Sequence, residues 1–140
     1  MGELNLAEDR FKNWKMPKIE EKKLHPKYYF LVQHKDKLKL GKNTDIGAFT
    51  YINAKYGVEI KENVQIGSHC SIYSISTIDN KSGKIVIKEN AKISSHCTVM
   101  PGVTIGKNSV IGAHSYVNID IPDNTIAYGV PVKIKGKINK

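Results

Sequence analysis

The chain has 140 residues, the size of one domain, and 40% of them are hydrophobic, which is enough for a continuous core. Its net charge of +9 comes from 21 lysines and one arginine; such a surface attracts phosphates, but sequence readout favours arginine and no nucleic-acid-binding motif is present. No apolar run reaches the roughly 18 residues of a membrane span, and the N-terminus lacks the apolar stretch of a secretory signal. We therefore expect a cytoplasmic protein without a membrane span or nucleic-acid partner.

Residues 1–37 precede any repeat, and we expect them to form an N-terminal cap. The stretch KYYFLVQ, residues 27–33, predicts a strand or cover over the first repeat. A repetitive stack of short strands needs such a cover because its open end would otherwise expose the core to water. Trp14, Tyr28, Tyr29 and Phe30 are the aromatic residues that would supply it.

An aliphatic residue returns at every sixth position through residues 38–121. This spacing matches neither the 3.6-residue period of a helix nor the two-residue period of a flat strand. Two residues are inserted between the first and second blocks of three, and nine between the second and third. The series reads Leu40, Ile46, Ile52; Ile60, Ile66, Ile72; Ile87, Ile93, Val99; Ile105, Ile111, Val117.

The six-residue period predicts a short strand and a tight corner in each hexad. Three hexads would close one triangular coil, and coils would stack about 4.8 Å apart with parallel pairing. We therefore predict an all-β fold, a parallel β-helix solenoid of about four coils of three hexads each. A loop would be inserted at residues 78–86, and residues 122–140 would form a C-terminal tail.

Stacking these hexads aligns two columns of corner residues, which tests the proposed register. One column reads Asn43, Asn63, Asn90 and Asn108, and asparagine tolerates the positive φ of a tight corner better than most residues. The other column reads Phe49, His69, His96 and His114. Cys70 and Cys97 fall in one inward column on adjacent coils, where we expect buried free thiols.

Three roles are open for the stacked histidines. They can be corner residues only, because histidine is also enriched at positive φ. One of them can act as a catalytic base, or together they can hold a metal ion.

The hexad pattern over residues 38–136 resembles the hexapeptide-repeat proteins with a left-handed parallel β-helix, most of which are acyltransferases. The stretch MPGVTIGKNSVIGAHSYVNIDIPDNTIAYGVPVK, residues 100–133, is similar to the maltose and galactoside acetyltransferase group. This resemblance implies acetyl-CoA as the co-substrate and a homotrimer with its sites between subunits. It also implies that Ser95, Ala113, Asn118 and Lys133 bind coenzyme A.

The resemblance implies an acceptor site at Asn53 and departs from the family at Thr77. The family carries a catalytic histidine in a stretch resembling I-x-T-x-x-H, and Thr77 stands where that histidine would be. Either the base lies elsewhere, with His96 the first candidate and His69 the second, or the acceptor is an amine that needs no base. Asp79 would orient an ammonium group or sugar hydroxyls.

We therefore expect an acetyltransferase that moves an acetyl group from acetyl-CoA to a sugar amine or hydroxyl. The sugar would be nucleotide-linked or belong to a surface polysaccharide. Two alternatives remain: a metalloprotein like the γ-class carbonic anhydrases, and a solenoid that has lost its base and is not catalytic. The γ class has a His-x4-His pair among its zinc ligands. This sequence lacks such a pair, so we expect no metal.

Overall fold

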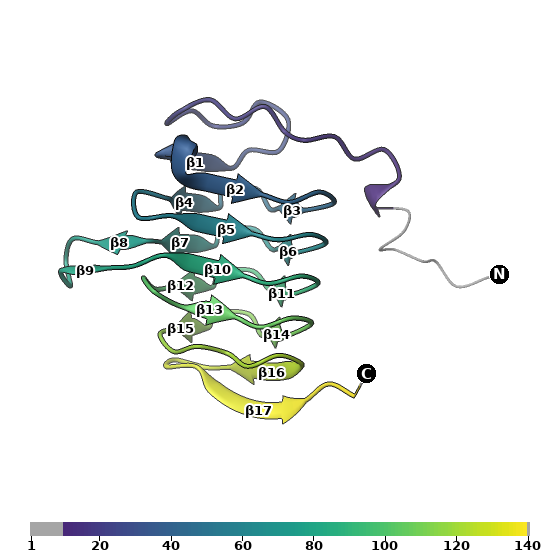
Figure 1. Ribbon diagram of the computed structural model, residues 1–140, viewed down its shortest axis with the longest axis vertical. Helices are drawn as coiled ribbons and strands as arrows, with labels where there is room; N and C mark the ends of the chain where they lie inside the picture. Colours follow the sequence, from purple (N-terminus) through teal and green to yellow (C-terminus); the bar gives the residue numbers. More distant parts are fainter. Residues whose placement is uncertain (1–9, 140) are drawn as a thin grey trace.

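Short strands wind into a stack of five turns, with the aliphatic residues of the hexads filling its interior (Figure 1). The computed structural model describes residues 10–139. Successive turns contribute short strands to three sheets, and the pairing between turns is parallel, so the predicted fold class, an all-β parallel β-helix solenoid, is confirmed.

Three sheets form the sides of the stack. The five-stranded sheet contains β1 (Leu31–Gln33), β4 (Tyr51–Asn53), β7 (Ser71–Tyr73), β12 (Thr98–Val99) and β15 (Tyr116–Val117). The four-stranded sheet contains β2 (Leu38–Leu40), β5 (Val58–Ile60), β10 (Ile85–Ile87) and β13 (Thr104–Ile105). The six-stranded sheet contains β3 (Asp45–Ile46), β6 (Gln65–Ile66), β11 (Lys92–Ile93), β14 (Val110–Ile111), β16 (Thr125–Tyr128) and the antiparallel β17 (Lys133–Lys137).

The stack is one turn taller than the four coils predicted. β1 lies inside the segment expected to be a cap, and it pairs in parallel with β4. β16 lies inside the segment expected to be a tail, and it pairs in parallel with β14. These outer turns escape the hexad pattern because a 3-10 turn, η1 (Lys35–Lys37), separates β1 from β2, while Ile121 forms a single bridge to Ile105 instead of a strand.

The predicted register of the hexads is confirmed through both insertions. Strand partners join Ile60 to Ile87, for example, and Ile72 to Val99. Every aliphatic residue of the series from Ile46 onward is buried. Burial of about 1.5–3 kcal/mol per side chain of this size makes the interior column the main favourable term of the fold.

Corner residues adopt the positive φ angles that the two columns predict. The asparagines Asn43, Asn63, Asn90 and Asn108 have φ between 54° and 64°, and Asn124 extends the column by one turn. Phe49 and the three histidines have φ between 58° and 63°, and Tyr29 extends that column in the other direction.

A hairpin interrupts the third turn and projects from the side of the stack (Figure 1). It is formed by β8 (Ile75–Ser76) and β9 (Lys81–Ser82), which pair antiparallel, and the Gly83 N–H closes its base by donating to the Ser74 carbonyl at 2.9 Å. The loop expected at residues 78–86 is therefore a hairpin that starts at Ile75, and residues 85 and 86 belong to β10.

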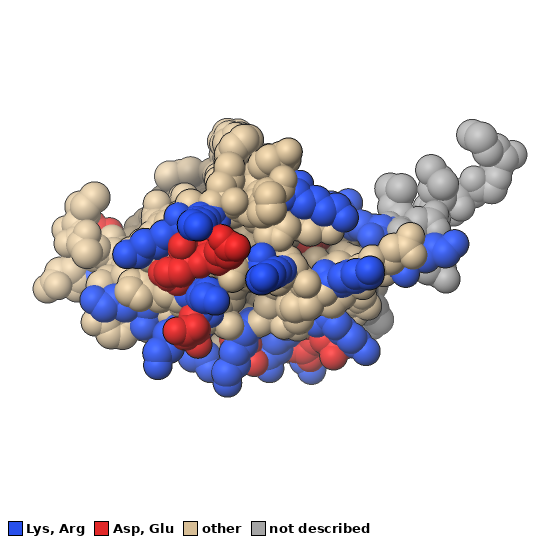
Figure 2. Space-filling view, turned by 90° about the horizontal axis from the view of Figure 1, so that it is seen from above, with Lys and Arg blue, Asp and Glu red and all other residues tan. Residues whose placement is uncertain are grey.

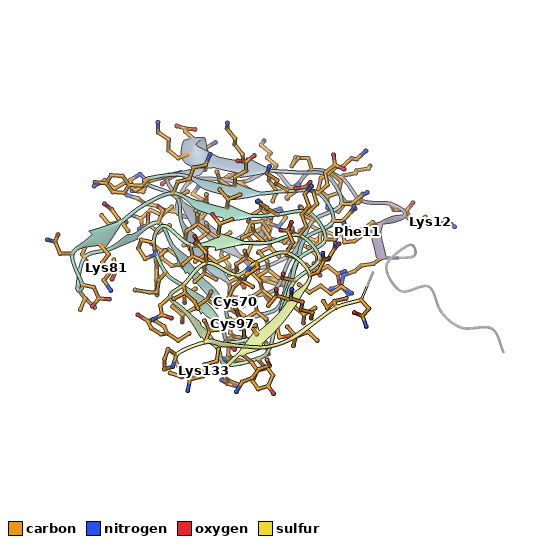
Figure 3. The ribbon with its side chains drawn as sticks, turned by 60° about the horizontal axis from the view of Figure 1, so that its bottom comes forward. Phe11, Lys12, Cys70, Lys81, Cys97 and Lys133 are labelled. Atoms are coloured by element: carbon orange, nitrogen blue, oxygen red, sulfur yellow. The ribbon has the colours of Figure 1, made fainter. Side chains whose placement is uncertain are left out.

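The two cysteines lie in the interior on adjacent turns, and both are free (Figure 3). Their thiols donate to the carbonyls of Ser94 and Gly112 at 3.2 and 3.1 Å. A hydrogen bond with Cys97, together with burial, raises the pKa of the Cys70 thiol. Cys70 is therefore a neutral core residue.

The N-terminal segment crosses the first turn and covers part of its open end. Trp14 Nε1 donates to the Thr44 carbonyl at 2.8 Å, and Arg10 pairs with Asp45. Figure 2 views the molecule from this end and shows lysine side chains spread around it, with acidic side chains in fewer places. Within residues 10–139, no helix has the length and apolar character needed to cross a membrane.

Candidate functional site

A groove beside the hairpin brings together two of the predicted acceptor residues, Asn53 and Thr77. Its volume is about 270 Å³. Asn53 lies at the end of β4, and Thr77 follows β8, so the groove forms where the hairpin leaves the five-stranded sheet. The full lining is Tyr51, Asn53, Tyr73, Ile75, Ser76, Thr77 and Ile78.

Hydrogen bonds hold the Asn53 side chain in one orientation. Asn53 Nδ2 donates to the Tyr51 hydroxyl at 3.2 Å, and Asn53 Oδ1 accepts from the Lys55 backbone N–H at 3.2 Å. The Tyr51 hydroxyl in turn donates to Gln33 Oε1. Burial raises the pKa of Tyr51, so this hydroxyl stays neutral and keeps donating. The result is a fixed polar wall on one side of the groove.

Tyr51 and Tyr73 add aromatic surface to the groove, which sequence reasoning missed. Their rings lie 5.8 Å apart at an angle of 58°. Both residues flank an inward aliphatic residue, Ile52 or Ile72, and the two-residue period of a strand turns them outward. This alternation was the available signal, because Asn53 shares the same outward face.

Thr77 lies on the exposed hairpin and offers a hydroxyl where a base was expected from the family pattern. Asp79 is nearby on the same hairpin, and its carboxylate accepts a hydrogen bond from the Ser76 hydroxyl at 3.4 Å. The groove lining itself contains no acidic and no histidine side chain. Among residues 10–139, the lining of this groove therefore supplies no carboxylate or imidazole as a general base.

The histidines lie together at the opposite end of the same sheet. His69, His96 and His114 precede β7, β12 and β15, whereas Asn53 is the last residue of β4 and Thr77 follows β8 in the hairpin. Successive imidazole rings are stacked 4.7 Å apart with an interplanar angle of 8°. All three side chains are exposed.

Two of the predicted coenzyme A residues share this histidine corner. Ser95 and Ala113 immediately precede His96 and His114, and the Ser95 carbonyl accepts from the His114 N–H at 3.0 Å. Ser95 also packs against the next turn, since a Cβ on Gly67 would lie 2.7 Å from the Ser95 nitrogen. A small side chain suits both positions, because it leaves the corner backbone accessible.

The remaining two coenzyme A candidates lie at the C-terminal end of the stack. Asn118 follows β15 and is exposed, and Lys133 begins β17 opposite Tyr128. Figure 3 places Lys133 at this end, well separated from Lys81 on the hairpin. Apart from Asp79 on the hairpin, the site residues predicted from sequence thus occupy three places: the groove, the histidine corner and the C-terminal end.

A second cavity of about 270 Å³ lies under the N-terminal segment, where Trp14, Tyr28 and Phe30 contribute to its lining. It contains none of the predicted site residues. Among the residues that the structure describes, no cluster of three or more His, Cys, Asp or Glu side chains is arranged to hold a metal ion. The metalloprotein alternative therefore has no supporting observation in this part of the chain.

Comparison with known proteins confirms the sequence resemblance. Residues 84–118 match the family described as bacterial transferase hexapeptide (six repeats). A galactoside O-acetyltransferase from Lactococcus lactis is 39% identical over 114 residues, which are 71% of this chain and 55% of the relative. A galactoside O-acetyltransferase from Escherichia coli is 62% identical over 39 residues, 28% of this chain and 19% of the relative. The chain thus spans about half the length of the first relative.

Solved structures share the architecture. A hexapeptide-repeat acetyltransferase from Vibrio cholerae in complex with acetyl coenzyme A superposes with a TM-score of 0.73 and 25% identity, covering 79% of this chain and 66% of the other. A galactoside acetyltransferase in complex with coenzyme A gives a TM-score of 0.71 and 33% identity, covering 79% and 60%.

Proposed function

We propose that this protein transfers an acetyl group from acetyl coenzyme A to a hydroxyl or amine group of a small sugar. The main support is a polar, aromatic groove with an oriented Asn53, carried on a solenoid whose relatives are named as galactoside acetyltransferases. Tyrosine rings pack on the apolar faces of sugars, while amide and hydroxyl groups meet sugar hydroxyls. The sugar is expected to be nucleotide-linked or part of a surface polysaccharide.

Transfer in this proposal is direct. The acceptor oxygen or nitrogen attacks the thioester carbonyl carbon, a new C–O or C–N bond forms, and the C–S bond breaks. The acceptor loses one proton, and the departing coenzyme A thiolate gains one. Asn53 would hold the acceptor, while Ser95, Ala113, Asn118 and Lys133 would hold coenzyme A.

The proposal includes a homotrimer with sites shared between subunits. His96 and His69 lie at one edge of the five-stranded sheet, and the groove lies at the other edge. A histidine can therefore serve as base for this groove only if the corner of one subunit faces the groove of the next. His96 is the preferred base because it adjoins Ser95 at the proposed thioester site.

An amine acceptor would make this base unnecessary. A fraction of an amine is already unprotonated near pH 8, and it attacks a thioester more readily than a hydroxyl does. Thr77, an exposed hydroxyl in place of the family histidine, favours this variant. Positioning of both substrates would then supply most of the rate enhancement.

The decisive assay is acetyl-CoA-dependent thiol release with paired amino sugars and hydroxyl sugars, free and nucleotide-linked. Turnover with amines alone would support the base-free variant, and turnover with hydroxyl sugars would support a histidine base. No release with any acceptor, combined with no affinity for coenzyme A, would refute the proposal in favour of a non-catalytic solenoid. A zinc analysis would then examine the metalloprotein alternative.

Lys133→Glu should weaken coenzyme A binding by about tenfold or more, because a charge-assisted phosphate contact is replaced by repulsion. Acceptor binding should change much less. Lys42→Glu, an equally exposed change on the first turn, is the control and should leave coenzyme A affinity unchanged. Equal affinities of wild type and the Lys133 variant in a calorimetric titration would remove Lys133 from the coenzyme A site.

A further inference from the structure

Two lysines lie beside the groove, and each belongs to a different element. Lys55 is the second residue after β4, and its backbone N–H donates to Asn53 Oδ1. Lys81 is the strand partner of Ser76, which lines the groove. Figure 3 shows Lys81 on the projecting hairpin. Both lysine side chains are exposed, and the Lys55 ammonium lies 5.8 Å from the centre of the Tyr56 ring.

The charges of these two lysines are not offset by ion pairs. Lys84, the other lysine of this region, lies 3.4 Å from Glu59 and is neutralised by it. Within residues 10–139, neither Lys55 nor Lys81 has a carboxylate oxygen within 4.0 Å. Asp79 is the acid of the hairpin, and its carboxylate accepts a hydrogen bond from the Ser76 hydroxyl.

The described lining of the groove carries no charge, so the charges beside it are those of Lys55, Lys81 and the single acid Asp79. Its lining consists of tyrosine, asparagine, serine, threonine and isoleucine side chains. A neutral concave surface with ammonium groups beside it attracts an anion and disfavours a cation. Since Asn53, Ser76 and Thr77 supply hydrogen-bonding groups and Tyr51 and Tyr73 supply ring faces, the lining itself suits a neutral sugar ring.

We propose that Lys55 and Lys81 form an anion subsite, so that the groove selects an acidic sugar bearing a phosphate or a carboxylate group. The sugar ring lies against the tyrosines and Asn53, and its anionic group lies toward the two ammonium groups. This inference rests on the proposed function, because it identifies the acceptor class for the same groove. Asp79 opposes the subsite, and its removal strengthens anion binding.

The test is a binding titration in the absence of acetyl-CoA with galactose 1-phosphate, galacturonic acid and galactose. We expect at least one acidic sugar to bind about tenfold or more tightly than galactose at low salt, as charge-assisted contacts provide. Tighter binding of galactose 1-phosphate identifies phosphate as the recognised group, and tighter binding of galacturonic acid identifies carboxylate. Equal affinity for all three sugars would overturn the subsite.

Variants locate the effect on the two lysines. The Lys55→Gln, Lys81→Gln double variant should lose the preference for the acidic sugar and keep its affinity for galactose. Lys42→Gln, an exposed lysine on the first turn, is the matched control and should keep the preference. Asp79→Asn should shift affinity for the acidic sugar in the opposite direction. An unchanged preference in the double variant would refute the assignment.

Failure of this inference is distinguishable from failure of the proposed function. Thiol release with neutral and acidic sugars at equal kcat/KM would support acetyl transfer and overturn the anion subsite. Selective binding of an acidic sugar without thiol release would support the subsite and contradict acetyl transfer by this chain.

Discussion

At the scale of single residues, backbone conformation accounts for much of what resembles a catalytic pattern. Two of the three corners of the turns hold one residue with φ between 54° and 64°. Asparagine occupies this position at one corner, and mostly histidine occupies it at the other. The same demand repeats at every turn, so a column of stacked imidazoles is not by itself evidence of a catalytic role. A functional role for His96 therefore has to be tested with the corner conformation preserved.

His96→Asn preserves that conformation, since asparagine occupies the equivalent corner with φ between 54° and 64°. If the acceptor is a hydroxyl, we expect thiol release to slow at least about tenfold, because general base catalysis contributes roughly 10²–10⁴-fold. His114→Asn is the control, as it removes a stacked ring from the same corner one turn away. Equal rates in all three proteins would leave His96 as a corner residue.

Gly47 is constrained by close contact with the next turn and not by its own backbone conformation. A Cβ at this position would lie 2.4 Å from the backbone carbon of Gly67 and from the nitrogen of Ser68. Gly47→Ala should therefore lower the free energy of unfolding by about 1–3 kcal/mol, measured by urea denaturation. Gly136→Ala has no atom within 4 Å of the new Cβ and should change stability far less. Equal effects would refute the contact argument.

At the scale of elements, insertions into the hexad pattern carry the distinctive parts of the molecule. The hairpin of β8 and β9 builds one side of the groove. The 3-10 turn η1 in the first turn is held by a side chain, because Glu21 accepts the backbone N–H groups of His34 at 2.7 Å and Lys35 at 2.8 Å. Side-chain hydrogen bonds of this kind satisfy backbone N–H groups where the chain leaves the parallel ladder.

The Glu21 contact predicts acid sensitivity at the capped end. The backbone N–H groups of Lys35 and His34 lower the pKa of Glu21 from its ordinary value of 4.5. A lowered folded-state pKa adds stability above the unfolded-state pKa, and this stability is lost as the pH falls through the folded-state value. The difference in Tm between wild type and Glu21→Gln should therefore shrink between pH 6 and pH 3. A constant difference would contradict this linkage.

At the scale of the whole molecule, each turn is stabilised mainly by its interfaces with the neighbouring turns. Each turn contacts only the turns above and below, as in other solenoids, so a defect is felt most strongly by its neighbours. The ends are special because they have one neighbour only. The N-terminal segment with Trp14 covers one end, and β17 lies against β16 at the other.

Ile72→Ala tests this coupling in the central turn. Ile72 is fully buried, and its truncation should lower the free energy of unfolding by about 2–5 kcal/mol. Native-state hydrogen exchange should show the largest loss of protection in β4, β7 and β12, the strands paired in sequence around this position. A uniform loss that includes β16 to the same degree would indicate a single cooperative unit instead.

By itself, the sequence determined the solenoid, its register and its corner conformations. The reason is physical: the narrow interior admits one aliphatic side chain per side of each turn, and each corner demands a small or positive-φ residue. Twelve repeats of that rule leave little freedom. The hand of the coil was taken from the resemblance, because six-residue spacing suits either hand.

Only the tertiary structure decided where the chemistry can occur. The sequence did not reveal the outer turns at β1 and β16 because these segments lack hexad spacing. They belong to the stack because they pair in parallel with β4 and β14. The groove was hidden because Tyr51 and Asn53 meet Thr77 across two turns and a hairpin. The sequence also did not show that His96 and Thr77 lie apart. His96 precedes its strand and Thr77 follows one, and this placement depends on where each strand begins and ends.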